Sequence, residues 1–582
     1  MFQIKLFASL TSGIEPNVCQ TKPLNEFPRS ARGLYRSRSC FRARRLDLVL
    51  DLHHMQGSNI LDHFVHLCRI MVASFGIHIG NTSVCLAVSR DGKTDVVAAP
   101  TGDRVTPAIV AFTDAEVVVG LAAKQGRLRN MANTVTDNKK MLVGGGGDEG
   151  VGSAVNVIEE NGQHFYCVDF KEQETRVSPA EILGHLLTYL HSIAETHCKE
   201  VSEAHTVLSV PLDWSREERS LVGNAATKVG FRVVQLISAP AAACLAYGLG
   251  QLDPGEREIA LVYRFEKNDL QDAVFLPLAV NLVVILFICR VGGVSTDLAL
   301  VLVAGGCYSI LESVAMDGLG GHQLTEVLTT FLGREFKQKY KEDILQSKKG
   351  RAKLANQAET VKHVLSTLDT AHCYVESLYD GMDFSSNVTR ARFDNQLSPV
   401  LTELMAPLSL LLTKAGLTPE DVDSVVMVGG STKVVKLQNA LANAFPDAEV
   451  LTSIPGDEVL AYGAAVHASL LTKEGTTEPN VSMMSISKDI SARVVGLGGE
   501  DDEVEVVCAD TPLPVKKSVP LAVTGENTSV EVLWGEDVLD TLSLATNAAT
   551  KLFFALHLHR DGTATVTLQD KTTGSASTLT LS

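Results

Sequence analysis

From residue 75 onward, short β-rich runs alternate with segments whose apolar residues recur at helical spacing. The helix predicted over residues 178–199 begins with a Ser-Pro-x-Glu capping box that has proline at the first helical position. A strand predicted over 205–210 and a helix predicted over 215–229 repeat the unit. This alternation predicts an α/β fold in which helices cover a mixed sheet.

The two ends of the chain follow other patterns. Residues 1–70 have no apolar period, and seven arginines fall between Arg29 and Arg45 with no acidic residue among them. We interpret them as a disordered or non-native extension, and a transit peptide stays open because such peptides are rich in arginine. The polar segment 473–495 is interpreted as a linker. After it, β-rich runs separated by Gly, Pro, Asn and Asp predict a small all-β domain over 496–582.

One stretch interrupts the α/β pattern of residues 71–472. Residues 273–289 are 17 consecutive uncharged residues, the lower limit for a membrane span. A span there would divide one apparent domain between the two sides of a membrane, so we expect no membrane segment. We interpret 265–290 as an insertion, in which 283–289 is a candidate buried strand. Its removal would join a strand ending at Arg264 directly to a glycine turn.

Composition and residue spacing argue against several functions. The net charge of -17 over 582 residues disfavours a nucleic-acid binder, since neutralising phosphates needs a basic face. The 11 cysteines have no paired spacing, which favours reduced thiols over disulfides or a zinc site. The histidines are isolated, so no metal site is predicted. Residues 145–150 match the G-x-G-x-x-G pattern of dinucleotide-binding loops. No predicted strand and helix flank them, so we expect no dinucleotide site there.

Three turns rich in glycine and hydroxyl residues each follow an apolar β run. Glycine lets backbone N–H groups approach an anion closely, and Ser or Thr adds a donor. Two of the turns open similar hairpins, which predicts a duplicated fold whose halves hold a polyphosphate between them. The candidate residues are Gly80, Asn81, Thr82 and Ser83 in the first turn, Gly292, Gly293, Val294 and Ser295 in the second, and Gly429, Gly430, Ser431 and Lys433 in the third.

Longer motifs resemble the heat-shock seventy family of chaperones. The resemblance runs from about residue 75 to residue 471 and continues more faintly into the β-rich region. It rests on Gly102–Ala108, Ala241–Gly248, Val388–Phe393, Val428–Lys433 and Asp457–Ala465. It implies an actin-like ATPase fold, duplicated, two-lobed and ribonuclease-H-like, over residues 71–472. The β-rich domain would then be a truncated substrate-binding-like domain without a helical lid.

The resemblance also implies ATP as the ligand, and it transfers roles to matching residues. Lys140 aligns with the lysine that steadies the γ-phosphate. Asp297 matches an acid beside the second turn, and Asp457 belongs to the motif that closes the second lobe. The positions that would hold the adenosine are Glu359, Lys362, Ser366 and His363, the last standing where the family has an arginine.

The chain departs from the family at the residues expected to support hydrolysis. His78 and Ala239 replace an aspartate and a glutamate, and Arg264 or Arg290 replaces a second aspartate. Two further changes lie in the turns, at Asn81 and Val294. The lost acids are expected to hold the water shell of magnesium and to orient the attacking water. The resemblance therefore implies ATP binding with impaired hydrolysis, and it leaves open whether magnesium binds.

The same losses resemble an atypical, ribosome-associated branch of the family. That branch implies a J-domain co-chaperone, the ribosome and nascent polypeptides as partners, and the cytosol as location. The first hypothesis is therefore an ATP-binding partner subunit at the ribosome. The alternative is an active ATP-hydrolysing chaperone that cycles on unfolded clients. A sugar kinase on the same fold is disfavoured, because the family motif around residues 390–393 and the β-rich domain both favour a chaperone.

Overall fold

The computed structural model describes most of residues 73–473 and the strands that follow them. The described residues are 73–142, 155–160, 162–198, 201–249, 283–304, 307–473, 488–495, 503–507, 511, 515–521, 527–535, 537–546, 552–559, 563–570 and 575–581. The chain divides into residues 1–69 and 70–582, and all described residues belong to the second unit. The predicted extension 1–70 and Arg264 lie outside the described residues.

The first lobe is built on a sheet with the strand order β12-β11-β1-β2-β3, in which β4 also pairs with β2. Its strands are β1 (Ser74–Ile79), β2 (Ser83–Arg90), β3 (Lys93–Val96), β4 (Val105–Pro107), β11 (His205–Val210) and β12 (Arg232–Ser238). Along the main path, β3, β2 and β1 pair antiparallel, whereas β1, β11 and β12 pair parallel. This sheet carries the first glycine turn, between β1 and β2.

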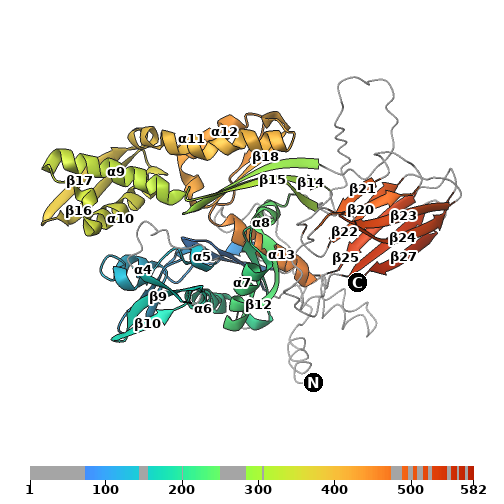
Figure 1. The fold of residues 1–582 in the computed structure, drawn as a ribbon, viewed down its shortest axis with the longest axis horizontal. Coiled ribbons are helices and arrows are strands. Elements are labelled where there is room, and N and C mark those ends of the chain that lie inside the picture. Colours follow the sequence, from blue (N-terminus) through green and yellow to red (C-terminus); the bar gives the residue numbers. More distant parts are fainter. Residues whose placement is uncertain are drawn as a thin grey trace, which may run out of the picture. The chain divides into compact units, whose positions relative to one another are not determined.

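The second lobe repeats this topology. Its sheet has the order β15-β14-β13-β18-β19, with β13 (Val283–Val291), β14 (Ser295–Ala304), β15 (Cys307–Asp317), β18 (Ser424–Val428) and β19 (Glu449–Leu451). Here β15, β14 and β13 pair antiparallel, and β13, β18 and β19 pair parallel. The same order and the same directions make the fold a duplication, and Figure 1 shows the long strands of the second sheet in light green.

Strand β13 overlaps the predicted insertion 265–290. Residues 283–291 pair with β14 on one side and β18 on the other, so they form the centre of the second sheet. The interpretation of residues 283–289 as a buried strand is therefore confirmed. Residues 283–290 lead directly into the second glycine turn. The insertion over 265–290 stays a prediction, and residues 265–282 lie outside the described part of the chain.

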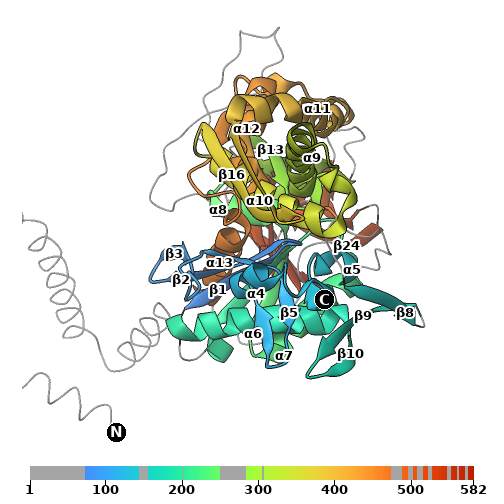
Figure 2. The same cartoon turned by 90° about the vertical axis from the view of Figure 1, so that its left-hand side faces the viewer.

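In the described part of the chain, eight longer helices belong to the two lobes. They are α6 (Pro179–His197), α7 (Arg216–Val229), α8 (Ala239–Ala246), α9 (Gly321–Tyr340), α10 (Lys348–Leu365), α11 (Arg390–Lys414), α12 (Val435–Ala444) and α13 (Val459–Lys473). The capping box of α6 is formed: Glu181 N donates to Ser178 Oγ at 3.2 Å, and Ser178 N donates to Glu181 Oε2 at 2.7 Å. Figure 2 shows α6 beside α7 in the first lobe. The predicted helices at 178–199 and 215–229 and the strand at 205–210 are thus confirmed.

Shorter elements complete the two lobes. In the first they are β5 (Val110–Phe112), β6 (Val117–Val119), α4 (Leu121–Gly126), β7 (Thr134–Val135), α5 (Asn138–Leu142), β8 (Asn156–Glu160), β9 (Gln163–Phe170) and β10 (Gln173–Val177). In the second they are the hairpin strands β16 (Thr370–Tyr379) and β17 (Met382–Thr389). Short 3-10 turns occur at Met131–Asn133, Val201–Glu203, Ile344–Gln346, Pro419–Asp421 and Gly430–Lys433. Among the described residues, no helix is long and apolar enough to cross a membrane.

Small residues allow α8 and α13 to cross closely. A Cβ atom on Gly463 of α13 would lie 1.8 Å from the carbonyl oxygen of Ala242 in α8. A Cβ atom on Gly76 of β1 would lie 2.1 Å from the backbone nitrogen of Ala465. Because neither glycine has a side chain, α13 packs directly on β1 and on α8. These contacts lie beside a cluster of buried apolar residues, many of them alanines, that spans both lobes.

The described residues after 487 form two four-stranded sheets, β21-β20-β23-β24 and β22-β25-β26-β27. The strands are β20 (Ile490–Val494), β21 (Glu503–Val507), β22 (Val515–Leu521), β23 (Asn527–Trp534), β24 (Asp537–Ala545), β25 (Leu552–Leu558), β26 (Ala564–Asp570) and β27 (Ala576–Leu581). Their buried side chains, including Phe554 and Val530, form one shared core. Strand β20 lies inside the predicted linker 473–495, so the β-rich domain begins no later than Ile490.

Candidate nucleotide-binding site

The first two glycine turns have the same hydrogen bond and touch each other. Gly80 N donates to Ser83 O at 2.8 Å, and Gly292 N donates to Ser295 O at 2.9 Å. A Cβ atom on Gly293 would lie 2.1 Å from Thr82 Cγ2. Turns from the two lobes, more than 200 positions apart in the sequence, therefore meet without space between them.

The third turn joins the same place. Gly429 has a φ angle of 93°, a left-handed conformation that favours glycine, and its N–H donates to Gly456 O at 2.6 Å. Ser431 Oγ donates to Gly292 O at 3.0 Å. Gly430 lies next to Asp457: a Cβ atom added to Gly430 would be 3.9 Å from the Cβ atom of Asp457. The structure thus brings together the three turns that the sequence analysis selected.

Helix α9 begins against the second turn. Gly321 N donates to Gly292 O at 2.8 Å, and His322 N donates to Gly293 O at 2.7 Å. His322 also approaches the first lobe, where its Nε2 lies 4.0 Å from Asp137 Oδ1. The carbonyl groups of the second turn are therefore held by α9, which leaves the turn little freedom to move.

His78 and Arg290 occupy equivalent positions in the duplicated fold. Each lies two residues before the first glycine of its turn, on β1 and on β13. His78 Nδ1 shares a hydrogen bond of 2.8 Å with Ser209 Oγ on β11. Burial, and next the charges of Lys139 and Arg290, lower the pKa of His78 well below its ordinary value. His78 is therefore a neutral imidazole at pH 7.

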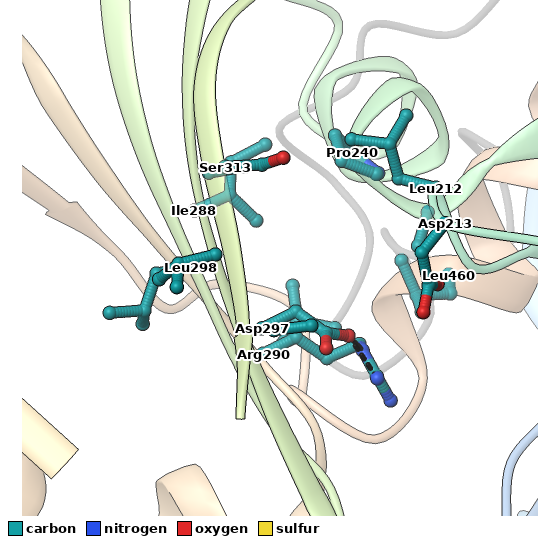
Figure 3. Close-up of a pocket in the computed structure, with 14 residues that line it drawn as sticks. Leu212, Asp213, Pro240, Ile288, Arg290, Asp297, Leu298, Ser313 and Leu460 are labelled. Atoms are coloured by element: carbon teal, nitrogen blue, oxygen red, sulfur yellow. Dashed lines mark hydrogen bonds and ion pairs between the residues drawn. The ribbon is translucent and has the colours of Figure 1, made fainter. Parts of the chain in front are cut away.

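Arg290 forms an ion pair with Asp297 across β13 and β14. Arg290 Nε donates to Asp297 Oδ2, and Nη2 contacts the same oxygen. Arg290 Nη2 also donates to Ser295 Oγ at 3.3 Å. Figure 3 shows the two side chains next to each other at the end of the sheet. Of the two arginines considered from the sequence, Arg290 thus holds the position before the second turn, while Arg264 lies outside the described residues.

A cavity of about 100 Å³ lies between the second sheet and α8. Its lining is mostly apolar and comes from both lobes: Leu212, Asp213, Ala239, Pro240, Ile288, Arg290, Asp297, Leu298, Ala299, Ser313, Val314, Ala315, Val428 and Leu460. Ala239, where the family has a glutamate, contributes only a methyl group to it. Arg290, Asp297 and Asp213 are the charged residues of this lining.

Lys139, and not its neighbour Lys140, has the buried ammonium group of this region. Lys139 is 9% exposed, and its Nζ donates to Ile79 O at 3.0 Å, beside the first turn. Burial, and next the charge of Arg290, lower the pKa of Lys139 to about 7. Lys140 contributes its backbone N–H, which donates to Asn81 Oδ1 at 3.3 Å. The sequence analysis missed Lys139 because two adjacent lysines differ only in burial.

The adenosine candidates share one face of α10. Lys362 Nζ lies 2.7 Å from Glu359 Oε2 and donates to Gly321 O at 3.0 Å, and His363 Nε2 bonds Glu359 Oε1 at 2.9 Å. Burial opposes the ionisation of Glu359, but the bond with His363 and the charge of Lys362 outweigh it and lower its pKa. Burial lowers the pKa of Lys362, although the negative charge of Glu359 acts in the opposite direction. Ser366 ends the helix and donates through Oγ to Lys362 O at 3.1 Å.

Lys433 of the third turn forms an ion pair with Asp457. Lys433 Nζ lies 2.6 Å from Asp457 Oδ2. Asp457 Oδ1 is buried and has no hydrogen-bond partner among the described residues. A buried acceptor without a partner is unfavourable. Asp457 therefore keeps one carboxylate oxygen able to accept a donor from a bound group.

The residues present fit a polyphosphate better than a magnesium ion. Glycine turns, the buried Lys139 and Arg290 supply donors and positive charge, as anionic phosphates require. Among the described residues, no group of three or more His, Cys, Asp or Glu side chains is placed to hold a metal. Mg²⁺ bound with a nucleotide keeps several waters and takes its other oxygen ligands from the phosphates and from one or two carboxylates. At the centre of the site Asp297 is already paired with Arg290, so this carboxylate is not free to hold magnesium.

The duplicated two-lobe architecture and its converging turns define an actin-like ATPase fold. The family model described as Hsp70 protein matches residues 74–537. Mouse Heat shock 70 kDa protein 14 is 35% identical over 536 residues, covering 88% of this chain and 99% of the mouse protein. The human Heat shock 70 kDa protein 14 is 34% identical over 529 residues (86% and 98%), and Xenopus laevis Heat shock 70 kDa protein 14-B is 34% identical over 532 (88% and 99%). The chain belongs to the Hsp70 family, which confirms the resemblance found in the sequence.

Proposed function

We propose that this Hsp70-family chain is an atypical chaperone that binds ATP with weak or no hydrolysis. It acts with a J-domain co-chaperone at the ribosome, in the cytosol, and keeps nascent polypeptides folding-competent. The observation that carries the ATP part is the Arg290–Asp297 ion pair at the meeting point of the turns. The ribosomal part is supported by the likeness to the ribosome-associated branch. We also propose that the β-rich domain is substrate-binding-like.

Weak hydrolysis follows from the charges in the site. Phosphoryl transfer needs a positioned water and neutralisation of the charge on the leaving oxygens. His78 is neutral and bonded to Ser209, and Ala239 has no group that could hold a water. The paired carboxylate of Asp297 is oriented toward Arg290. The lowered pKa of His78 makes it a weak general base, and the carboxylate of Asp297 is held by Arg290.

The test is ATP binding measured beside single-turnover hydrolysis on the full-length protein. We expect saturable binding, with hydrolysis no faster than in buffer alone. The triple variant H78D/A239E/R290D returns the family acids and is expected to raise turnover while binding persists. Clear turnover by the natural protein would support the alternative instead, because Asp297 is then sufficient to position the attacking water.

The ribosomal part has its own test. The full-length protein is mixed with ribosomes that carry nascent chains, with and without a J-domain co-chaperone, and sedimented. We expect co-sedimentation that requires the co-chaperone and does not require ATP turnover. Binding to unfolded clients with ATP-driven release, and without ribosomes, is the outcome that contradicts this part.

A further inference from the structure

We propose that this chain binds its nucleotide without a divalent metal, and that Arg290 and Lys139 supply the positive charge that faces the phosphates. The inference rests on the proposed ATP binding and states how the site neutralises a polyphosphate. Two positively charged side chains, one from each lobe, take the place of a metal ion. Their positions, remaining donors and neighbours carry the argument.

Arg290 directs an unused donor at the second turn. Its Nε and Nη2 are bound to Asp297 and Ser295. Within the described part of the chain, Nη1 makes no hydrogen bond. A Cβ atom on Gly292 would lie 3.4 Å from this nitrogen, so Nη1 lies beside the turn. A guanidinium nitrogen next to the partly exposed backbone of a glycine turn is an arrangement that binds phosphate oxygens.

Lys139 has unused donors on the other side. Its side chain is buried and donates to Ile79 O at 3.0 Å, which uses one of the three N–H groups of an ammonium. Its Nζ also lies 4.9 Å from the centre of the Trp214 ring. A buried ammonium with unused donors is unfavourable unless an anion approaches it. Ile79 directly precedes Gly80, so such an anion would lie at the first turn.

The positive charges around the site oppose the binding of a metal ion. Asp297 is paired with Arg290, and Asp213 is exposed at the edge of the cavity. Lys139 and His78 respond electrostatically to Arg290, so these groups share one neighbourhood. A dication placed among them would be repelled by both cations. ATP that is free of metal carries more negative charge than its magnesium complex, and this site therefore favours the metal-free form.

The decisive measurement is equilibrium binding of ATP to the full-length protein in EDTA and in excess Mg²⁺. We expect binding in EDTA, and an affinity weaker by about tenfold or more when Mg²⁺ captures the nucleotide. Binding that requires Mg²⁺ overturns this inference and leaves the proposed ATP binding intact. Absence of binding under both conditions overturns the proposed function itself, so the two failures are distinguishable.

Variants of Arg290 test the assignment. R290D exchanges the cation for a carboxylate and is expected to reverse the preference, so that Mg²⁺ strengthens binding. The matched control is R176M, which removes an arginine that is 59% exposed and paired with Glu160 at 2.6 Å, in the β8–β10 sheet away from the turns. The control should keep the natural preference for EDTA. If R290D does not fold, the comparison of EDTA with Mg²⁺ on the natural protein still decides the question.

Discussion

The side chain of Thr82 lies directly against Gly293, so that turns from the two lobes touch. A Cβ atom at position 293 would be 2.1 Å from Thr82 Cγ2 and 2.6 Å from its Oγ1. Thr82 belongs to the turn between β1 and β2, and Gly293 to the turn between β13 and β14. The spacing of the two turns at the candidate site therefore depends on the absence of a side chain at position 293.

Replacing Gly293 by alanine should separate the two turns. The added methyl group would overlap Thr82, and the lobes would have to move apart at the phosphate end of the site. We expect G293A to weaken ATP binding by about tenfold or more, as a shift of about 1 Å in a binding site can do. Equilibrium binding measures this. G126A is the control, because a Cβ on Gly126 meets nothing within 4 Å.

A second substitution tests the cause of that loss. The double variant T82G/G293A removes the atoms that the new methyl group would strike, so it should recover a large part of the affinity. If G293A binds ATP as the natural protein does, the contact does not control the site. If the double variant binds no better than G293A, the loss comes from the backbone at position 293 and not from Thr82.

ATP affinity should increase as the pH falls from 9 to 7. The pKa of Lys139 is about 7 in the free protein, lowered by burial and by Arg290 and raised by Asp297 and Asp213. A bound anion raises this pKa, so binding takes up a proton when the pH is above 7, and lower pH favours the complex. His78 faces the same group but is neutral across this range. Titrations at pH 7, 8 and 9 measure the effect.

The variant K139M shows whether Lys139 is the group that takes up the proton. It should bind ATP more weakly, and its affinity should be nearly the same at pH 7 and pH 9. The control K140M keeps the buried ammonium and should retain the pH dependence of the natural protein. A pH dependence that persists unchanged in K139M would assign the proton to another group.

Two helical glycines should respond to alanine in opposite directions. In G463A the new Cβ would lie 1.8 Å from Ala242 O, a backbone atom that cannot move without shifting α8. Overpacking of this kind costs about 1–3 kcal/mol or more. In G184A on α6 the Cβ meets nothing within 4 Å, and the gain in helix propensity stabilises by about 0.5–1 kcal/mol. Thermal unfolding of both variants checks the signs, and a stable G463A would contradict the close crossing of α8 and α13.

Glu359 should stabilise the second lobe at neutral pH. Its pKa is lowered in the folded state, so its contribution is present above its unfolded pKa of about 4.3 and is lost as the pH falls. E359Q leaves the buried Lys362 without its carboxylate and should cost about 1–3 kcal/mol at pH 7. Urea unfolding midpoints at pH 7 and pH 4 test this, because the difference from the natural protein should shrink at pH 4. E326Q, which breaks the more exposed pair with Arg351, should have a smaller effect.

Local signals in the sequence predicted several elements correctly. The capping box at Ser178 and Glu181 depends on residues three positions apart, so it can be seen without the rest of the chain. The two hairpin turns at residues 80–83 and 292–295 are also local, because glycine and the flanking β runs determine them. Ordered motifs along the chain were sufficient to indicate the Hsp70 family, which the comparisons confirm.

The identity of the charged residues at the centre of the site depended on the tertiary structure. Lys139 and Lys140 are equivalent in sequence, and only packing against Ile79 and Trp214 buries one of them. Arg290 was one of two candidates until the pairing of β13 with β14 and β18 placed it before the second turn. Burial and strand pairing are made by residues far apart in the chain. The sequence by itself therefore determined the fold family and the turns, whereas long-range packing decided which charges meet between them.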